Sequence, residues 1–217
     1  MPISFNFYQD QVLGDGNSAA PLEPAHRLLF LRHGTAKVNG ETLSTGQFTY
    51  CGDAVSFEGD TDWSEIWRWE LSRPNLPHQL LQGNGVLSRP KLAQTITTLE
   101  TEPDTDWVFR LDRITSAPGR VTPRHQHHGP GIRCLYQGTF NVEDQGHKIL
   151  DIGPGDAWWE SGTETVVAWH SLQFPAIFIR GLLLPIELEG TISNIWITDE
   201  TPSQLNWDLL YEQKITL

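Results

Sequence analysis

The chain has little cysteine, few basic residues and no long hydrophobic run, and each shortage excludes a class of protein. Its two cysteines, Cys51 and Cys134, form no CxxC pair, so neither a zinc knuckle nor a redox motif is indicated. Two buried thiols in a reducing compartment are favoured over a single disulfide between them. The apolar stretch 176–186 is interrupted by Arg180 and is far too short to span a bilayer.

The shortage of positive charge excludes whole classes of partner. Lys and Arg number 15 against 27 Asp and Glu, which gives a formal net charge of −12 over 217 residues. Such a field repels phosphate backbones and anionic headgroups, so we expect neither a nucleic-acid nor a membrane partner. The first ten residues hold neither the basic flank nor the apolar run of a signal peptide. The sequence therefore predicts a cytoplasmic protein.

Glycine and proline, in contrast, are plentiful and divide the chain into short segments. Between 19 Gly and 14 Pro lie short runs rich in Val, Ile, Leu, Trp, Phe and Thr, and no long amphipathic helix is evident. Regular short strands separated by turns predict an all-β barrel or sandwich. One short helix is predicted over Ser88–Thr98, with Ser88 as its cap and Pro90 in its first turn.

An internal repeat indicates that the fold is duplicated. The sequence GTAKV at residues 34–38 returns as GTFNV at residues 138–142. In each copy an apolar strand precedes the motif, and a turn, a strand and an aromatic stretch follow it, which favours duplication over chance. We therefore predict an amino-terminal barrel over residues 1–72, a linker over 73–103 and a carboxy-terminal barrel over 104–217.

The candidate chemistry lies in the carboxy-terminal copy, at His125-Gln126-His127. Side chains alternate between the two faces of a strand, so the two imidazoles point the same way. Two imidazoles on one face suit a single divalent metal. The alternative is that they are two partly exposed histidines at the end of a strand.

The stretch that contains these histidines resembles the cupin superfamily. Gly119, His125, His127 and Gly138 have the spacing of the first cupin motif, and Ile152–Asp156 resembles the turn that opens the second. The resemblance is clear in the second copy and fainter in the first. It implies an all-β double-stranded β-helix, the jelly-roll barrel of cupins, duplicated as a bicupin. The first copy has no HxH, so we expect its barrel to be structural or dimerising.

The sequence departs from the usual three-His-one-Glu ligand set of the family. Gly131 stands at the position of the first-motif Glu, and Glu164 and Thr165 stand where the second-motif His is expected. Glu160, His128 and His170 are further replacement candidates. A facial triad of His125, His127 and Glu164 would leave three positions open on Fe, Mn, Zn or Ni. The predicted metal ligands are His125, His127, Glu164 and His170, and the predicted pocket residues are Tyr136, Trp158, Glu160 and Thr165.

Three functions stay open at this level, all with a small-molecule ligand in the carboxy-terminal barrel. The first is a metal-dependent enzyme of the oxygenase or isomerase type with an incomplete ligand set. The second is a metal-free binding or sensory cupin. The third is a metal-free, sugar epimerase-like cupin, in which a His held by a carboxylate acts as general base. No catalytic residue is assigned, and a homodimer is an open alternative to a monomer.

Overall fold

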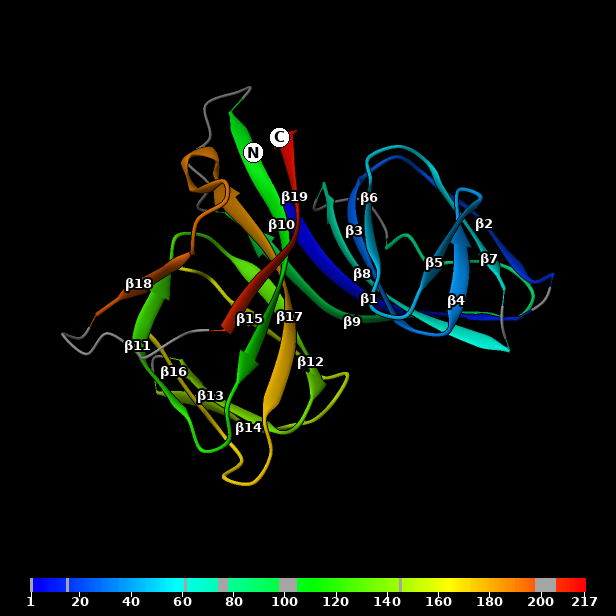
Figure 1. Ribbon diagram of the computed structural model, residues 1–217. Coiled ribbons are helices and arrows are strands. Elements are labelled where there is room, and N and C mark those ends of the chain that lie inside the picture. The colour runs from blue at the N-terminus through cyan, green and yellow to red at the C-terminus, as the bar shows by residue number, and fades with distance from the viewer. Residues whose placement is uncertain are drawn as a thin grey trace. The chain divides into compact units, whose positions relative to one another are not determined.

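Antiparallel strands are the main secondary structure of the described residues (Figure 1). The computed structural model describes residues 2–14, 16–60, 62–73, 78–97, 105–144, 146–197 and 206–217. The chain divides into two compact units, an amino-terminal unit, Met1–Glu100, and a carboxy-terminal unit, Thr101–Leu217. Both units consist of two β-sheets, as the predicted barrels require.

The amino-terminal unit contains the first nine strands. One sheet has the order β6-β3-β8-β1-β9, and the other has the order β2-β7-β4-β5. Its strands are β1 (Ile3–Leu13), β2 (Ser18–Leu22), β3 (His26–His33), β4 (Thr35–Val38), β5 (Glu41–Ser44), β6 (Phe48–Cys51), β7 (Val55–Gly59), β8 (Trp63–Ser72) and β9 (Val86–Ile96).

The carboxy-terminal unit contains the remaining strands in two sheets, β15-β12-β17-β10-β19 and β14-β13-β16-β11-β18. Its elements are β10 (Asp106–Ser116), β11 (Val121–His127), β12 (Gly131–Gln137), β13 (Phe140–Asp144), β14 (His147–Ile152), β15 (Ala157–Glu160), β16 (Val166–His170), β17 (Ala176–Pro185), the 3-10 turn η1 (Ile186–Leu188), β18 (Asn194–Trp196) and β19 (Asn206–Thr216). Among the described residues, no helix is long and apolar enough to cross a membrane.

The first sheets of the two units have the same strand order, which confirms the duplication. Each strand of the first sheet of one unit has a counterpart at the same place in the other, from β6 and β15 at one edge to β9 and β19 at the opposite edge. The repeated glycines lie directly after β3 and β12, at φ 78° for Gly34 and 90° for Gly138. Only glycine adopts this backbone conformation without strain, so both turns require it. The sequence signal therefore reflects a turn that both barrels need.

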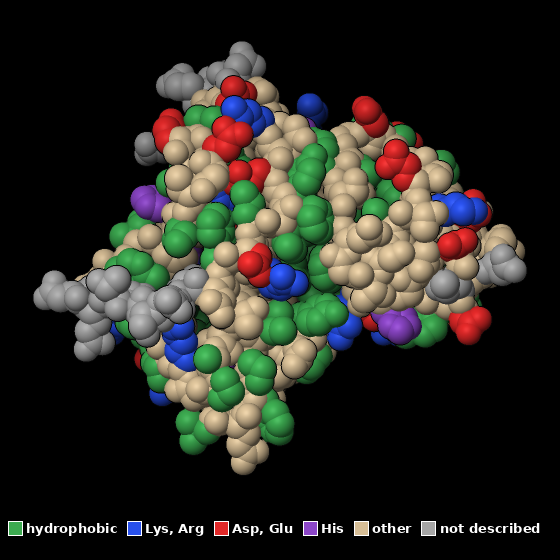
Figure 2. Space-filling view, in the orientation of Figure 1, with side chains coloured by type: hydrophobic (Ala, Val, Ile, Leu, Met, Phe, Trp, Pro, Cys, Tyr) green, Lys and Arg blue, Asp and Glu red, His purple; other side chains and the backbone are tan. Residues whose placement is uncertain are grey.

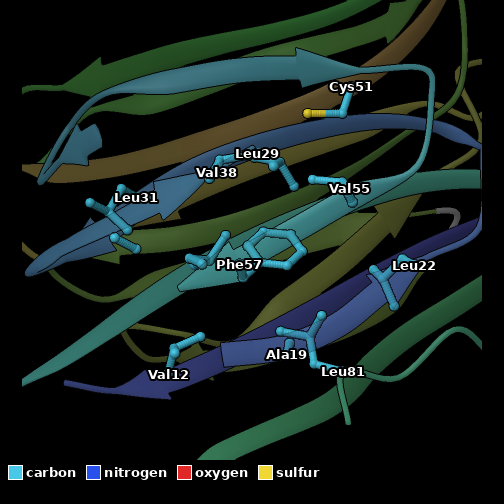
Figure 3. Packing of buried hydrophobic residues seen from close by; sticks show 12 residues of the cluster. Val12, Ala19, Leu22, Leu29, Leu31, Val38, Cys51, Val55, Phe57 and Leu81 are labelled. Carbon is cyan, nitrogen blue, oxygen red and sulfur yellow. The ribbon is translucent and has the colours of Figure 1, made fainter. Parts of the chain in front are cut away.

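The interior of the amino-terminal unit is apolar where the carboxy-terminal unit carries its histidines. Leu22 pairs with Val55 at the end of β2, as His125 pairs with Val166 in β11. Leu22 and Val55 are buried in one hydrophobic cluster with Leu81 and Phe57 (Figure 3). This packing leaves no metal-ligating side chain at the position that corresponds to the HxH pair.

Two predictions for the middle of the chain are wrong. Residues 88–96 belong to strand β9, not to a helix, because they pair with β1 along its full length. Pro90 fits there because β9 lies at the edge of its sheet and the register shifts opposite Pro90. The expected linker 73–103 therefore contains a strand of the amino-terminal unit. Thr98 and the linker residues 74–77 and 98–103 lie outside the described residues.

The cysteines and the surface charges follow the sequence analysis. Cys51 and Cys134 are both buried, and neither forms a disulfide. Burial raises the pKa of the Cys51 thiol, which keeps it protonated and unreactive. On the face drawn in Figure 2, Lys and Arg side chains are scattered among acidic ones and form no broad basic patch.

Candidate metal centre

The two histidines of the HxH motif lie on β11 and face the interior of the carboxy-terminal unit. His125 and His127 are buried, and their ring centroids are 4.9 Å apart at an interplanar angle of 89°. The residue between them, Gln126, is turned the other way and donates to the Thr163 carbonyl at the surface. The alternation of a β-strand therefore places the pair as the sequence predicted, and excludes two exposed rings at a strand end.

Glu160, the last residue of β15, completes a cluster with the two histidines. Its Oε2 lies 3.0 Å from Nε2 of His127, and one ligand atom from each of His125, His127 and Glu160 lies within 4.8 Å of the others. We call these three residues the triad. Glu160 on β15 pairs directly with Gly131 on β12. Gly131 stands at the position of the first-motif Glu, so here the carboxylate comes from the neighbouring strand. A side chain at Gly131 itself would collide with Leu182 and the Gly181 carbonyl.

The Glu160 carboxylate is charged and held in place. Trp158 donates its indole N–H to Oε1 over 2.8 Å, and Nη2 of Arg133 lies 2.8 Å from Oε2. Burial alone would raise the pKa of Glu160, but the Arg133 charge and the contact with His127 outweigh it and hold the pKa well below its usual range. Glu160 is therefore an ionised carboxylate at neutral pH, deep in the unit.

Both imidazoles are neutral and one has a defined tautomer. Nδ1 of His125 lies 2.8 Å from the Pro123 carbonyl, so it must be the protonated nitrogen and Nε2 carries the lone pair. Burial lowers the pKa of His125 and lowers that of His127 to about 3, although Glu160 opposes the shift in both. A neutral ring with a bare nitrogen is the form in which histidine binds a metal.

A cavity of about 40 Å³ lies beside the triad. Two arginines, Arg133 on β12 and Arg180 on β17, bring positive charge to its wall. Arg180 is bound through Nε and Nη2 to the two oxygens of Asp112, at 2.6 and 2.8 Å. The cavity is further lined by polar Thr122 and Asn194 and by apolar Ile114, Phe140, Val166, Ala168 and Phe178.

Solved structures resemble this architecture, whereas no protein-family model and no curated protein matches the sequence. AerE from Microcystis aeruginosa is 12% identical, with a TM-score of 0.60 over 83% of this chain and 88% of that one. Oxalate decarboxylase from Lactobacillus farciminis, as a formate complex, is 12% identical, with a TM-score of 0.61 over 88% and 79%. A mutant oxalate decarboxylase from Bacillus subtilis is 11% identical, with a TM-score of 0.59 over 88% of this chain and 71% of that one. AerE and oxalate decarboxylase are cupin proteins. The fold is that of the cupins.

In this barrel the predicted ligands Glu164 and His170 do not join the histidine pair. Burial, and after it the neighbouring carboxyl of Glu164, raises the pKa of Asp144 to about 6. His170 contacts Ser116, with Nε2 2.9 Å from the hydroxyl, and its ring stacks on Phe140. Of the four expected ligands, the structure brings together His125 and His127 alone, and Glu160 takes the place given to Glu164.

The predicted pocket residues lie at different places relative to this cavity. Glu160 lines the cavity, and Trp158 packs behind it in a hydrophobic cluster. Tyr136 and Thr165 are half-buried and do not line the cavity. Strand β12, which carries Tyr136, is buried on both faces, so hydrophobicity does not reveal which of its faces meets the cavity.

The sequence reasoning missed Arg133, Arg180 and Asn194 as cavity residues. An arginine inside an otherwise apolar strand was the available signal for the first two, since a buried guanidinium needs a partner. Asn194 carried no such signal, because it lies outside both cupin motifs.

The buried histidines predict that the metal-free protein loses stability in acid. With a pKa of about 3 in the folded state and about 6.5 when unfolded, His127 takes up protons on unfolding between these values. Stability is thus full above pH 6.5 and falls as the pH drops towards 3, by up to about 4–5 kcal/mol for this residue. His125 acts in the same direction.

Urea unfolding of chelator-treated protein at pH 7.0, 5.5 and 4.5 measures this loss. His127→Gln should flatten the dependence of stability on pH over that range, whereas His147→Gln, at the exposed start of β14, should not. An unchanged slope in His127→Gln would show that His127 is protonated in the folded state.

Proposed function

We propose that the carboxy-terminal barrel binds one divalent metal through His125, His127 and Glu160, and binds a small organic acid beside it. The observation that carries this proposal is the buried triad, whose three ligand atoms lie within 4.8 Å of one another. Three protein ligands are the usual number at a catalytic metal, and they leave positions open for substrate. Two histidines and one carboxylate suit Fe, Mn, Zn or Ni.

The residues fit a metal on structural grounds. Oε2 of Glu160 is buried and, among the described residues, accepts no well-aligned hydrogen bond, although it lies within ion-pair distance of His127 and Arg133. His125 presents its bare Nε2 on the same face. The buried Arg133 charge competes for the carboxylate and repels a cation, so we expect weaker binding than a full set of three His and one Glu gives.

A small acid is the proposed ligand because of the charges around the cavity. Arg133 and Arg180 are balanced by Glu160 and Asp112, so a bound divalent cation would leave the wall net positive. Nε and Nη2 of Arg180 are bound to Asp112, and its Nη1 lies outside that pair and is suited to a carboxylate. Among proteins of similar fold, an oxalate decarboxylase is described as a formate complex and another by its Mn(II) centres. A bound metal would supply Lewis acidity and open coordination positions, which suit oxygenase or isomerase chemistry.

Metal titration tests the triad directly. Metal-free protein should bind at most one Mn(II), Fe(II) or Zn(II) per chain, and Glu160→Gln should weaken binding more than about 100-fold. Loss of an outer-shell hydrogen-bond partner of a ligand already weakens metal binding about 10–100-fold. Calorimetry or competition with a chelator of known affinity gives the constants.

The matched control for this titration is Glu164→Gln, since Glu164 is the ligand that alignment to the motif favoured. It should bind metal as the wild type does. His125→Ala provides a second variant that leaves the Glu160–Arg133 pair intact, and it should bind as weakly as Glu160→Gln. Two tight sites per chain, or loss of binding in Glu164→Gln alone, would contradict the proposal.

A metal-free general base is the second candidate, because Glu160 lies within hydrogen-bond reach of His127. This is the carboxylate-held histidine that an epimerase-like site needs. A pKa of about 3, however, makes His127 a weak base at neutral pH. Elemental analysis separates the candidates: turnover of a sugar substrate by metal-free protein would favour the second.

A further inference from the structure

We propose that Asn194 supplies the amide oxygen of its side chain as a fourth protein ligand to this metal. The proposal rests on the metal-binding function put forward above. Asn194 opens β18, a three-residue strand that lies alongside β11 at the edge of its sheet (Figure 1). It is separated from the HxH motif by more than sixty residues. The strand therefore brings a distant part of the chain to the triad.

The register of β18 fixes which of its side chains meet the histidines. Residue 194 pairs with His127, and Trp196 pairs with His125. The pairing is bounded on both sides by backbone hydrogen bonds, from the His128 amide to Ser193 over 2.9 Å and from the amide of residue 197 to Arg124 over 3.1 Å. A shift of the strand by one residue would break both bonds.

Directly opposed residues of an antiparallel pair project from the same face, with Cβ atoms about 4.5–5.5 Å apart. Trp196 obeys this rule, since its ring centroid lies 5.5 Å from that of His125. Ile195 between them faces solvent. By the same rule Asn194 shares the inward face of His127, and its side chain lines the cavity beside the triad.

The amide oxygen of Asn194 is in the state expected of an unused ligand. Oδ1 is buried and has no hydrogen-bond partner among the described residues. Leaving a buried carbonyl oxygen without a donor costs free energy, so such atoms call for an explanation. Oε2 of Glu160, in the same cavity, is the other acceptor without a well-aligned donor. One cation bound between these two oxygens and the two imidazoles would give both oxygens a partner.

The donor set also indicates which metal gains most from Asn194. An amide oxygen is a hard, neutral ligand of the kind that suits Mn(II), and it adds no further charge to a cavity that holds two arginines. Tetrahedral Zn(II) accepts three protein ligands and a water. We therefore expect Asn194 to matter more for Mn(II) than for Zn(II).

The test measures Mn(II) and Zn(II) binding by purified metal-free protein and four variants. Asn194→Ala should weaken Mn(II) binding about 10-fold or more, and should raise the number of Mn(II)-bound waters, read from oxygen-17 broadening of the Mn(II) electron paramagnetic resonance signal, by one. Asn194→Asp keeps a ligating oxygen, so its Mn(II) affinity and its number of Mn(II)-bound waters should match those of the wild type. Ile195→Ala, on the outer face of the same strand, should match the wild type. His125→Ala should lose binding.

The outcomes separate the two proposals. If the wild type binds no metal, the metal-binding function fails and the ligand assignment with it. If the wild type binds one metal and His125→Ala does not, the function stands. Unchanged affinity and water count in Asn194→Ala then overturn the role of Asn194 alone. A loss confined to formate or oxalate binding, with Mn(II) affinity intact, would likewise overturn it and make Asn194 a ligand of the acid.

Discussion

Replacing Arg68 by Met is expected to lower the free energy of unfolding of the amino-terminal unit by about 3–5 kcal/mol. Arg68 is fully buried and donates to Asp10 and to Glu70, both over 2.7 Å. Its guanidinium also lies 3.9 Å from the ring centroid of Tyr8. Arg27 pairs with the same Glu70 oxygen. Without Arg68, the Asp10 carboxyl would lose its ion-pair partner in a site that water does not reach, and this uncompensated buried group is the cause of the loss.

Urea unfolding at pH 7, with hydrogen exchange of peptides from β1 and β8 as the readout for this unit, measures the effect. Lys37→Met is the matched control. Lys37 pairs with Glu58 over 2.6 Å, but both side chains are about a third or more exposed. Such a pair contributes about 0–1 kcal/mol. Equal losses in the two variants would show that burial does not set the strength of the Arg68 network.

Replacing Asp112 by Leu should destabilise the carboxy-terminal unit by a similar amount, about 3–5 kcal/mol. Asp112 accepts from Arg180 at 2.6 and 2.8 Å and from the indole of Trp207 at 2.9 Å. Arg180 is 2% exposed, so its charge has no access to solvent once Asp112 is gone. Because Arg180 lines the cavity, the variant should also weaken metal binding by adding an unbalanced positive charge.

The neighbouring residue of β10 provides the control. Arg113 pairs with Asp208 over 2.8 Å, and both side chains are about half exposed. Asp208→Leu should therefore cost no more than about 1 kcal/mol. The double variant Asp112→Leu with Arg180→Met should recover most of the stability, because it removes both buried charges. A double variant as unstable as Asp112→Leu alone would mean that lost packing, not a buried charge, causes the effect.

The duplicated all-β fold could be predicted because its signals are local. Gly34 and Gly138 adopt positive φ values that their turns require, and the flanking apolar runs have strand length. The helix predicted over Ser88–Thr98 is wrong for the opposite reason. A cap and a first-turn proline are local preferences, and pairing of β9 with β1 overrides them.

The orientation of the histidine pair was likewise determined by the sequence alone. A strand has a period of two, so His125 and His127 face the same way in any sheet that contains β11. The sequence alone did not determine which carboxylate lies beside this pair. Glu164 is nearest by alignment to the second motif, yet pairing of β12 with β15 places Glu160 opposite Gly131 and against His127.

Only the tertiary structure decided the rest of the site. Arg133 lies on a strand buried on both faces, so its direction depends on which sheet covers which side. Asn194 reaches the cavity because β18 pairs with β11 in one particular register, across a long separation in sequence. Local sequence fixes the conformation of a turn and the alternation of a strand. The partner of each strand, and hence the set of side chains that meet in the cavity, depends on contacts between distant segments, which local pattern does not encode.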